Sequence, residues 1–160
     1  MQEAIARLLL LQSSALEESE RTTVGEYIER RGESDKEDPV YYILAPNRAA
    51  ALASPYMETM LHNNKEVLIL SHPLDVFVVE HLHELDGKKL VSIESSDVSA
   101  HATPEASLSE EEVVGLKSFF EKALTKDRLS ELKISSRLTS SPAIVVDHDT
   151  AGRRRCAFAL

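Results

Sequence analysis

The chain has 160 residues, of which 42% are hydrophobic, so it is long enough for one compact domain or two small ones. Its 18 basic and 27 acidic side chains give a formal charge of −9, which argues against a surface that binds the phosphate backbone of nucleic acids. A single cysteine excludes an internal disulfide framework, and no apolar run approaches the roughly 20 residues that a membrane-spanning helix needs.

The five glycines are too widely spaced for the loops that bind nucleotide phosphates. The two closest, Gly25 and Gly32, are seven residues apart. The common phosphate-binding loops need closely spaced glycines because their backbone N–H groups must approach the phosphate. The sequence therefore predicts no self-contained nucleotide site and no cofactor bound by this chain.

The first third of the chain predicts two short helices separated by a loop. Residues 1–12 carry isoleucine and leucine at helical spacing, and residues 13–21 are polar. Thr23 and Glu26 then fit a capping box, in which each residue accepts the backbone N–H of the other. We expect the second helix to begin there and to end at Gly32.

Three short apolar segments alternate with helical patterns in the middle of the chain. These segments are residues 40–44, 67–70 and 90–93. They are rich in β-branched, aromatic and leucine residues, which predicts strands buried on both faces. Asn47 and Ser54 are placed to begin helices, and residues 73–85 carry an apolar stripe that Gly87 would end. Long connections favour parallel strands with right-handed crossovers, so the predicted fold class is α/β, a small three-layer α/β/α unit with a short parallel sheet.

A second, smaller unit is predicted after residue 94. Residues 95–108 are rich in serine, alanine, threonine and proline, which is typical of a linker. Ser109 and Glu112 fit a second capping box, and the helix should run to about Leu124. Its apolar face carries Val113, Leu116, Phe119, Phe120 and Ala123. Residues 132–134 and 143–146 predict two strands. The predicted organisation is an α/β/α unit at 1–94, a linker at 95–108 and the truncated start of an α+β domain at 109–160.

The polar residues give no strong catalytic pattern. His81 and His83 are two residues apart on a predicted helix, so they point to different sides, and we expect surface histidines and no metal site. One alternative is a small standalone α/β enzyme with its site at the carboxyl ends of the strands. The residues along that edge are Ser71, His72, Ser95 and Asp97. A concave pocket that joins His72 and Asp97 would favour this alternative.

Six blocks of sequence follow one another at a characteristic spacing. They are residues 41–48, 54–56, 66–68, 73–75, 82–92 and 136–143. Together they resemble the ninety-kilodalton heat-shock chaperone family, from about residue 4 to residue 146. The match is to the last part of that family's middle domain and the opening of its C-terminal domain. The tetrad at residues 45–48, Ala-Pro-Asn-Arg, is most similar to the mitochondrial paralogue of the family.

The resemblance implies a homodimeric, ATP-driven chaperone that binds client proteins and co-chaperones. It implies the mitochondrial matrix as the compartment, with the cytoplasm as the alternative. In that family an N-terminal domain binds ATP and magnesium, and the dimerising helices lie downstream of the matched region. The chain is therefore expected to be a fragment that lacks the ATP site and is inactive as an enzyme by itself. A further alternative is an adaptor that binds the full-length chaperone.

Two segments depart from the family's pattern. Residues 8–11 are four leucines where the family usually has Leu-Leu-Arg-aromatic, so a surface charge has become apolar. Residues 147–160 do not match the methionine-rich client-contact segment expected there. The predicted strands near the end of the chain lack partners, which favours self-association. The candidate residues of a partner interface are Ile134, Val145, Phe158 and Leu160.

Overall fold

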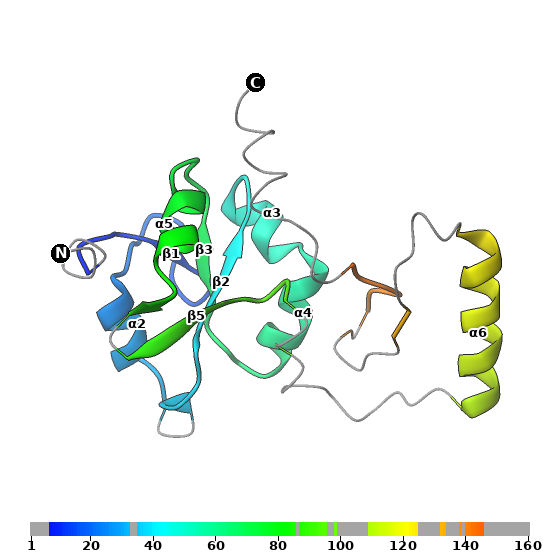
Figure 1. The fold of residues 1–160 in the computed structure, drawn as a ribbon. Helices are drawn as coiled ribbons and strands as arrows, with labels where there is room; N and C mark the ends of the chain where they lie inside the picture. Colours follow the sequence, from blue (N-terminus) through cyan, green and yellow to red (C-terminus); the bar gives the residue numbers. More distant parts are fainter. Residues whose placement is uncertain are drawn as a thin grey trace.

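One mixed sheet and five helices form the regular structure of the residues that a computed structural model describes, which are 7–32, 35–85, 87–95, 98, 109–124, 132–133, 138 and 140–145. The strands are β1 (Gln12–Ser13), β2 (Val40–Leu44), β3 (Leu68–Leu70), β4 (Glu84–Leu85) and β5 (Lys88–Ser92). The helices are α2 (Val24–Glu29), α3 (Arg48–Leu52), α4 (Pro55–His62), α5 (Asp75–His81) and α6 (Glu110–Ala123). Figure 1 shows α2 to α5 around the sheet and α6 set apart from it.

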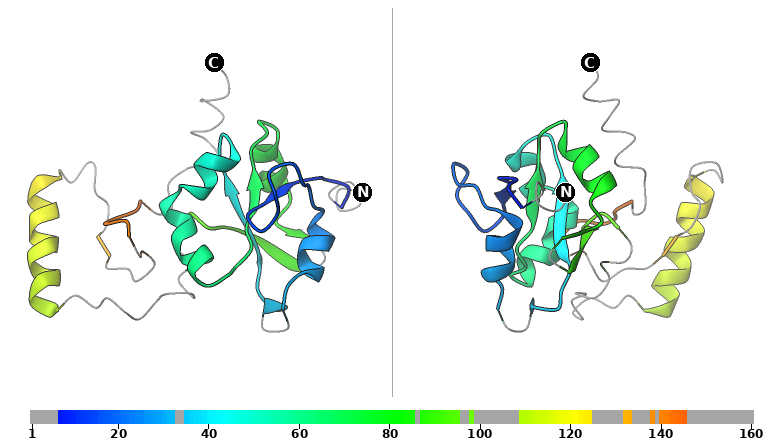
Figure 2. Two further views of the ribbon diagram at one scale, coloured as in Figure 1. Left: turned by 180° about the vertical axis from the view of Figure 1, so that it is seen from behind. Right: turned by 60° about the vertical axis from the view of Figure 1, so that its left-hand side comes forward.

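The three central strands are parallel, and β2 lies between the other two. The strand order across the sheet is β1-β3-β2-β5-β4. Ile43 of β2 pairs with Ile69 of β3, and Tyr41 on the other side of β2 pairs with Val91 of β5. The two crossovers move in opposite directions across the sheet and so use opposite faces, as connections of one hand must (Figure 2). The predicted parallel strands are confirmed, and the structure adds two antiparallel edge strands, β1 and β4.

The side chains of β2 alternate between two hydrophobic clusters, one on each face of the sheet. In the first cluster, Val40 and Leu44 pack with α2, β3 and α5. In the second cluster, Tyr41 and Ile43 pack with α3 and α4. The buried helix residues are Val24, Tyr27, Val76 and Val79 in the first cluster and Ala51, Met57 and Met60 in the second. Burial of a large apolar side chain stabilises a fold by about 1.5–3 kcal/mol, so the helices on both faces contribute to the stability of the sheet. The prediction of a three-layer α/β/α unit is confirmed.

Local capping interactions begin most of the helices where the sequence predicts them. The Thr23 hydroxyl accepts the Glu26 N–H, and the Glu26 carboxylate accepts the Thr23 N–H, which completes the predicted capping box of α2. That second hydrogen bond is the main reason why the pKa of Glu26 is lowered. Asn47 caps α3, and the capping box at Ser109 begins α6. Ser54 makes no side-chain cap, so α4 depends on the proline at its first position.

The helix predicted over residues 1–12 is wrong for the described part of that segment. Its residues before β1 are irregular, except for a β-bridge at Leu11. Leu9 and Leu11 pack against the first cluster, whereas Leu8 and Leu10 are 77% and 66% exposed. A run of four leucines fits the hydrophobic repeat of a helix and that of a strand equally well. The segment is extended because β1, which follows it, pairs with β3.

Helix α5 is shorter than predicted, and a different side of it faces the sheet. The prediction extended over residues 73–85, but α5 has seven residues. Val76 and Val79 are buried, whereas Leu74 and Phe77, which belong to the apolar stripe predicted over residues 73–85, are 61% and 46% exposed. Apolar residues lie on most sides of this short helix, so periodicity does not single out one stripe, and packing against the first cluster selects the valines.

Gly87 turns a hairpin instead of ending a helix. It lies between β4 and β5, which pair antiparallel, and its φ of +74° is in the left-handed region. Glycine occupies that region without the steric penalty that a Cβ atom brings. The prediction that Gly87 interrupts regular structure is therefore confirmed, whereas the prediction that it ends a helix is wrong.

Helix α6 has the predicted position, but none of its residues is buried. The strands predicted after it are wrong for the described residues: 132–133 and 143–145 form no strand. Residues 134 and 146 lie outside the described residues, and the division into 1–94, 95–108 and 109–160 stays a prediction. A strand needs a neighbour for its backbone hydrogen bonds, and no described residue pairs with these segments. None of the described helices is long and apolar enough to cross a membrane.

Replacing Gly87 with alanine should lower the free energy of unfolding by about 1 kcal/mol. No heavy atom lies within 4 Å of a Cβ built at Gly87, so the cost is that of the left-handed backbone and not of a clash. The same substitution at Gly115 in α6 also meets open space but has helical backbone, so it should not destabilise. Urea denaturation of both variants checks this; equal effects would contradict the backbone argument.

Candidate functional site

A polar pocket of about 280 Å³ lies where the chain enters β2 and β3. Its lining includes Tyr27, Arg30 and Arg31 from α2 and the turn after it, Asp35, Asp38 and Tyr41 around the start of β2, and Lys65 and Glu66 before β3. Three of these side chains are cationic and three are carboxylates, so their formal charges cancel. The pocket therefore has no excess charge with which to hold an ionic ligand.

Tyr27 lines this pocket and connects two of the strands. Its hydroxyl donates to the Glu66 carbonyl at 2.8 Å and accepts the Tyr41 N–H at 3.3 Å, so it links the starts of β2 and β3. The Arg31 guanidinium lies over the ring at 4.5 Å from its centroid. Burial raises the pKa of Tyr27, and the nearby Arg31 charge only partly opposes this. The hydroxyl is therefore protonated at neutral pH and serves as a strut between the two strands.

Lys65 ties the loop before β2 to the loop before β3. Its ammonium contacts the carboxylates of Asp35 at 2.5 Å and Asp38 at 3.0 Å. Burial disfavours the charged amine, but the hydrogen bonds to both carboxylates outweigh this and raise the pKa of Lys65. The ammonium and the two carboxylates thus satisfy one another and stabilise the two loops against each other.

A second ion pair connects α2 to the same loop. Arg30 contacts the Glu66 carboxylate at 2.6 Å, and the Ser13 hydroxyl of β1 donates to the same carboxylate. Arg31 donates to the Asp38 and Pro39 carbonyls at 2.6 Å each. The two contacts of Glu66 span 53 and 36 positions in the sequence, so they attach β1 and the end of α2 to the loop before β3. The pocket is therefore a structural junction at the amino ends of the strands.

The opposite edge of the sheet carries the residues of the enzyme alternative. The His72 ring accepts the Leu74 N–H through Nδ1 at 3.2 Å, and the His72 N–H donates to Asp75 at 2.8 Å. Burial raises the pKa of Asp75, although that hydrogen bond lowers it in part. These contacts form the turn that leads into α5, so they account for His72 structurally. Asp97 lies outside the described residues, so its approach to His72 stays untested.

The other histidines and carboxylates form no metal centre within the described part of the chain. His81 and His83 are both exposed, as predicted for surface residues. The His81 ring contacts the Phe77 carbonyl of its own helix at 2.8 Å through Nδ1. Local structure therefore accounts for the position of the His81 ring.

Of the four predicted interface residues, Val145 is the one that the structure describes. Its side chain is 68% exposed, and its carbonyl accepts the hydroxyl of Tyr56 from α4. Ile134, Phe158 and Leu160 lie outside the described residues. The hydrogen bond to Tyr56 is a contact within this chain, and a partner interface at Val145 stays a prediction.

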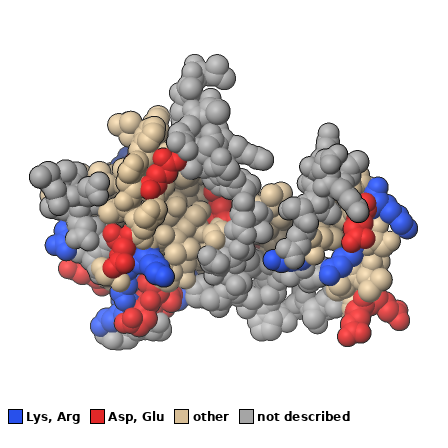
Figure 3. Space-filling view, viewed as in Figure 1, with Lys and Arg blue, Asp and Glu red and all other residues tan. Residues whose placement is uncertain are grey.

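Helix α6 carries exposed apolar side chains on one side. Leu116 and Phe119 are three residues apart and are 38% and 63% exposed, and Phe119 packs edge-on against Phe120 with ring centroids 5.6 Å apart. Acidic side chains gather at the amino-terminal end of the same helix (Figure 3). An apolar side bounded by an acidic end is a surface that another apolar chain can contact.

Comparison with protein families identifies the chain. The family model described as "Hsp90 protein" matches residues 1–152. The chain belongs to the Hsp90 family. Among its relatives, the chaperone protein HtpG of Photorhabdus laumondii is 38% identical over 148 residues, covering 89% of this chain and 23% of HtpG. The mitochondrial heat shock protein 75 kDa of Bos taurus is 35% identical over 154 residues, covering 91% of this chain and 22% of that protein.

Membership of the Hsp90 family confirms the resemblance at the level of the family. Bacterial HtpG and the mitochondrial protein are similarly distant from this chain, so the identities do not select the mitochondrial branch. The chain spans less than a quarter of the length of these curated relatives. What such proteins do as whole molecules therefore enters below as a proposal.

Sequence reasoning missed two functional candidates in this Hsp90-family chain, Tyr56 and Glu58 of α4. Both contact residues 140–145, which lie more than 80 positions later in the sequence. Tyr56 and Ser140 do fall within two of the blocks that carry the resemblance. Nothing in the sequence alone, however, pairs those blocks in space.

Replacing Lys65 with methionine should lower the free energy of unfolding at pH 7 by about 1–3 kcal/mol, because Asp35 and Asp38 lose the cation between them. The pKa of folded Lys65 is raised above 10.5, so this contribution is complete below that pH and falls as the pH rises through the raised value. Urea denaturation at a series of pH values measures it.

The matched control is Lys88→Met. Lys88 pairs with Glu37 at 3.2 Å, but Glu37 is 96% exposed, so this substitution should cost less than about 0.5 kcal/mol. Equal losses for the two variants at pH 7 would show that the Lys65 contact has no special weight.

Proposed function

We propose that this Hsp90-family chain acts as a structural and client-binding section of a molecular chaperone and does not turn over ATP by itself. The observation that carries the proposal is the match of the Hsp90 family model over residues 1–152. The exposed apolar side of α6 supports the client-binding part, because unfolded proteins offer apolar side chains.

The finer parts of the proposal follow from the resemblance. ATP and magnesium would act through a domain to which the residues of this chain do not correspond. Co-chaperones and a second subunit would be the partners of the longer protein. The mitochondrial matrix is the proposed compartment; the Ala-Pro-Asn-Arg tetrad at residues 45–48 and the relationship to the mitochondrial protein of Bos taurus support it.

The rigid part of the proposed section is the α/β/α unit. Packed cores move as bodies because their side chains interlock on both faces of the sheet. A unit of this kind suits the transmission of movement between the parts of a larger machine. The proposed role of the α/β/α unit is mechanical, and the exposed surfaces of the chain would bind the client.

The test of chaperone function measures aggregation and nucleotide turnover with the same preparation. The chain should reduce light scattering from a chemically denatured model enzyme as it refolds by dilution, and it should release no phosphate from ATP. Turnover of ATP, or a defined nucleotide-binding isotherm by calorimetry, would contradict the proposal. Full aggregation of the model enzyme at a tenfold excess of the chain would remove the client-binding part.

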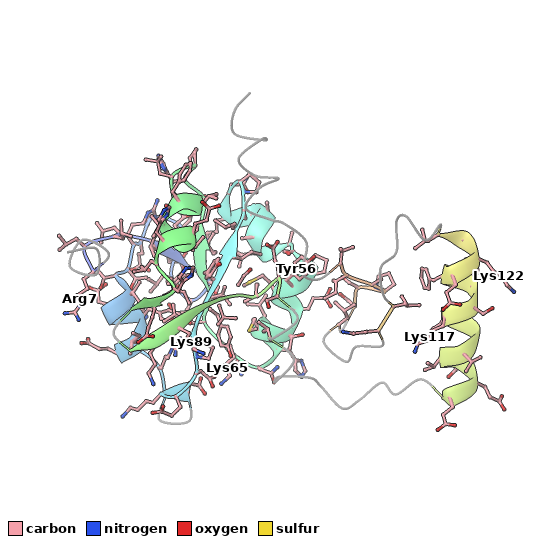
Figure 4. All side chains as sticks on the ribbon, viewed as in Figure 1. Arg7, Tyr56, Lys65, Lys89, Lys117 and Lys122 are labelled. Atoms are coloured by element: carbon pink, nitrogen blue, oxygen red, sulfur yellow. The ribbon has the colours of Figure 1, made fainter. Side chains whose placement is uncertain are left out.

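Self-association should depend on the apolar side of α6. In sedimentation velocity the chain is expected to shift to larger species as its concentration rises, and Phe119→Ser should reduce the shift at least about threefold. Lys122→Ser is the control, since Lys122 is an exposed charged residue of the same helix (Figure 4). A monodisperse monomer at high concentration would show that α6 does not drive association.

A further inference from the structure

Two side chains of α4 hold a distant segment of the chain. One oxygen of the Glu58 carboxylate accepts the backbone N–H groups of Ser140 at 2.9 Å and Ser141 at 3.3 Å. Its other oxygen accepts both serine hydroxyls, that of Ser140 at 2.9 Å. The Tyr56 hydroxyl donates to the Val145 carbonyl. The segment at residues 140–145 is thereby attached to α4 at both of its ends.

The Glu58 carboxylate accepts hydrogen bonds at both of its oxygens. A carboxylate offers about four lone-pair positions, and two amides and two hydroxyls supply four hydrogen bonds to them. Hydrogen bonds to an ionised acceptor are roughly twice as strong as those between neutral groups. Glu58 is therefore the main attachment and Tyr56 the lesser one.

Polar contacts hold this segment with little help from apolar burial. Residues 140–145 form neither helix nor strand, and Val145 is 68% exposed. Regions held by few buried apolar contacts open at low free-energy cost while the core stays folded. The attachment is thus able to release without unfolding of the sheet.

We propose that Glu58 and Tyr56 form a latch that fastens residues 140–145 to α4 and that can open while the α/β/α unit stays folded. The latch goes beyond the chaperone function and does not depend on it. Figure 4 shows Tyr56 extending from α4 toward the segment that follows α6 in the sequence. Because the acceptor is a carboxylate, a negative charge placed on the serines repels it and opens the latch.

Hydrogen exchange of the full chain tests the latch directly. In Glu58→Ala, the Ser140 and Ser141 amides should exchange at least about tenfold faster than in the unmodified chain. Tyr56→Phe should produce a smaller increase, centred nearer Val145. The amides of β2 and β3 should be unchanged in both variants, which shows that the sheet remains folded.

Substitutions on the other side of the latch keep the test independent of any effect on α4. Ser140→Asp should raise exchange at least as much as Glu58→Ala, whereas Ser140→Ala should raise it less, because alanine removes one hydrogen bond without adding charge. The matched control is Glu29→Ala, an exposed carboxylate at the end of α2, which should leave the segment unchanged. Unaltered exchange at residues 140–145 in both Glu58→Ala and Ser140→Asp would overturn the proposal.

The exchange measurements involve neither a client nor a nucleotide, so failure of the latch leaves the chaperone proposal to its own test.

Discussion

Burial of β2 on both faces is the constraint on which the rest of the sheet depends. Its backbone pairs with β3 on one side and β5 on the other, and its side chains enter both hydrophobic clusters. A strand in this position has no face or edge left for water, so helices must cover both sides. The two crossovers meet that requirement on opposite faces, and the edge strands β1 and β4 complete the sheet at its margins.

The polar contacts divide between the fold and its attachments. At the amino ends of the strands, Tyr27, Lys65 and Glu66 connect loops that flank the core, with charges that cancel within the pocket. On α4, Glu58 collects four donors from a segment that packs little apolar surface. The first group holds the unit rigid, whereas the second attaches an irregular segment to its surface.

Membership of the Hsp90 family gives these features a common setting. The chain spans less than a quarter of the length of its relatives, and the proposed function assigns to it surfaces and a rigid unit within a larger activity. The α/β/α unit has the packing of a rigid body, and α6 presents the exposed apolar residues. Rigid packing and an exposed apolar helix are the physical elements that the proposed function uses.

The sequence by itself determined the features that depend on near neighbours. The capping boxes at Thr23 and Ser109, the three parallel strands and the family all follow from residues within a short span or from blocks in order. Tertiary structure decided which side of each element is buried. The leucine run before β1 and the valines of α5 fit more than one periodicity, so contact with the sheet selected their faces. The same holds for Glu58, because its partners lie more than 80 residues away and no local pattern encodes that pairing.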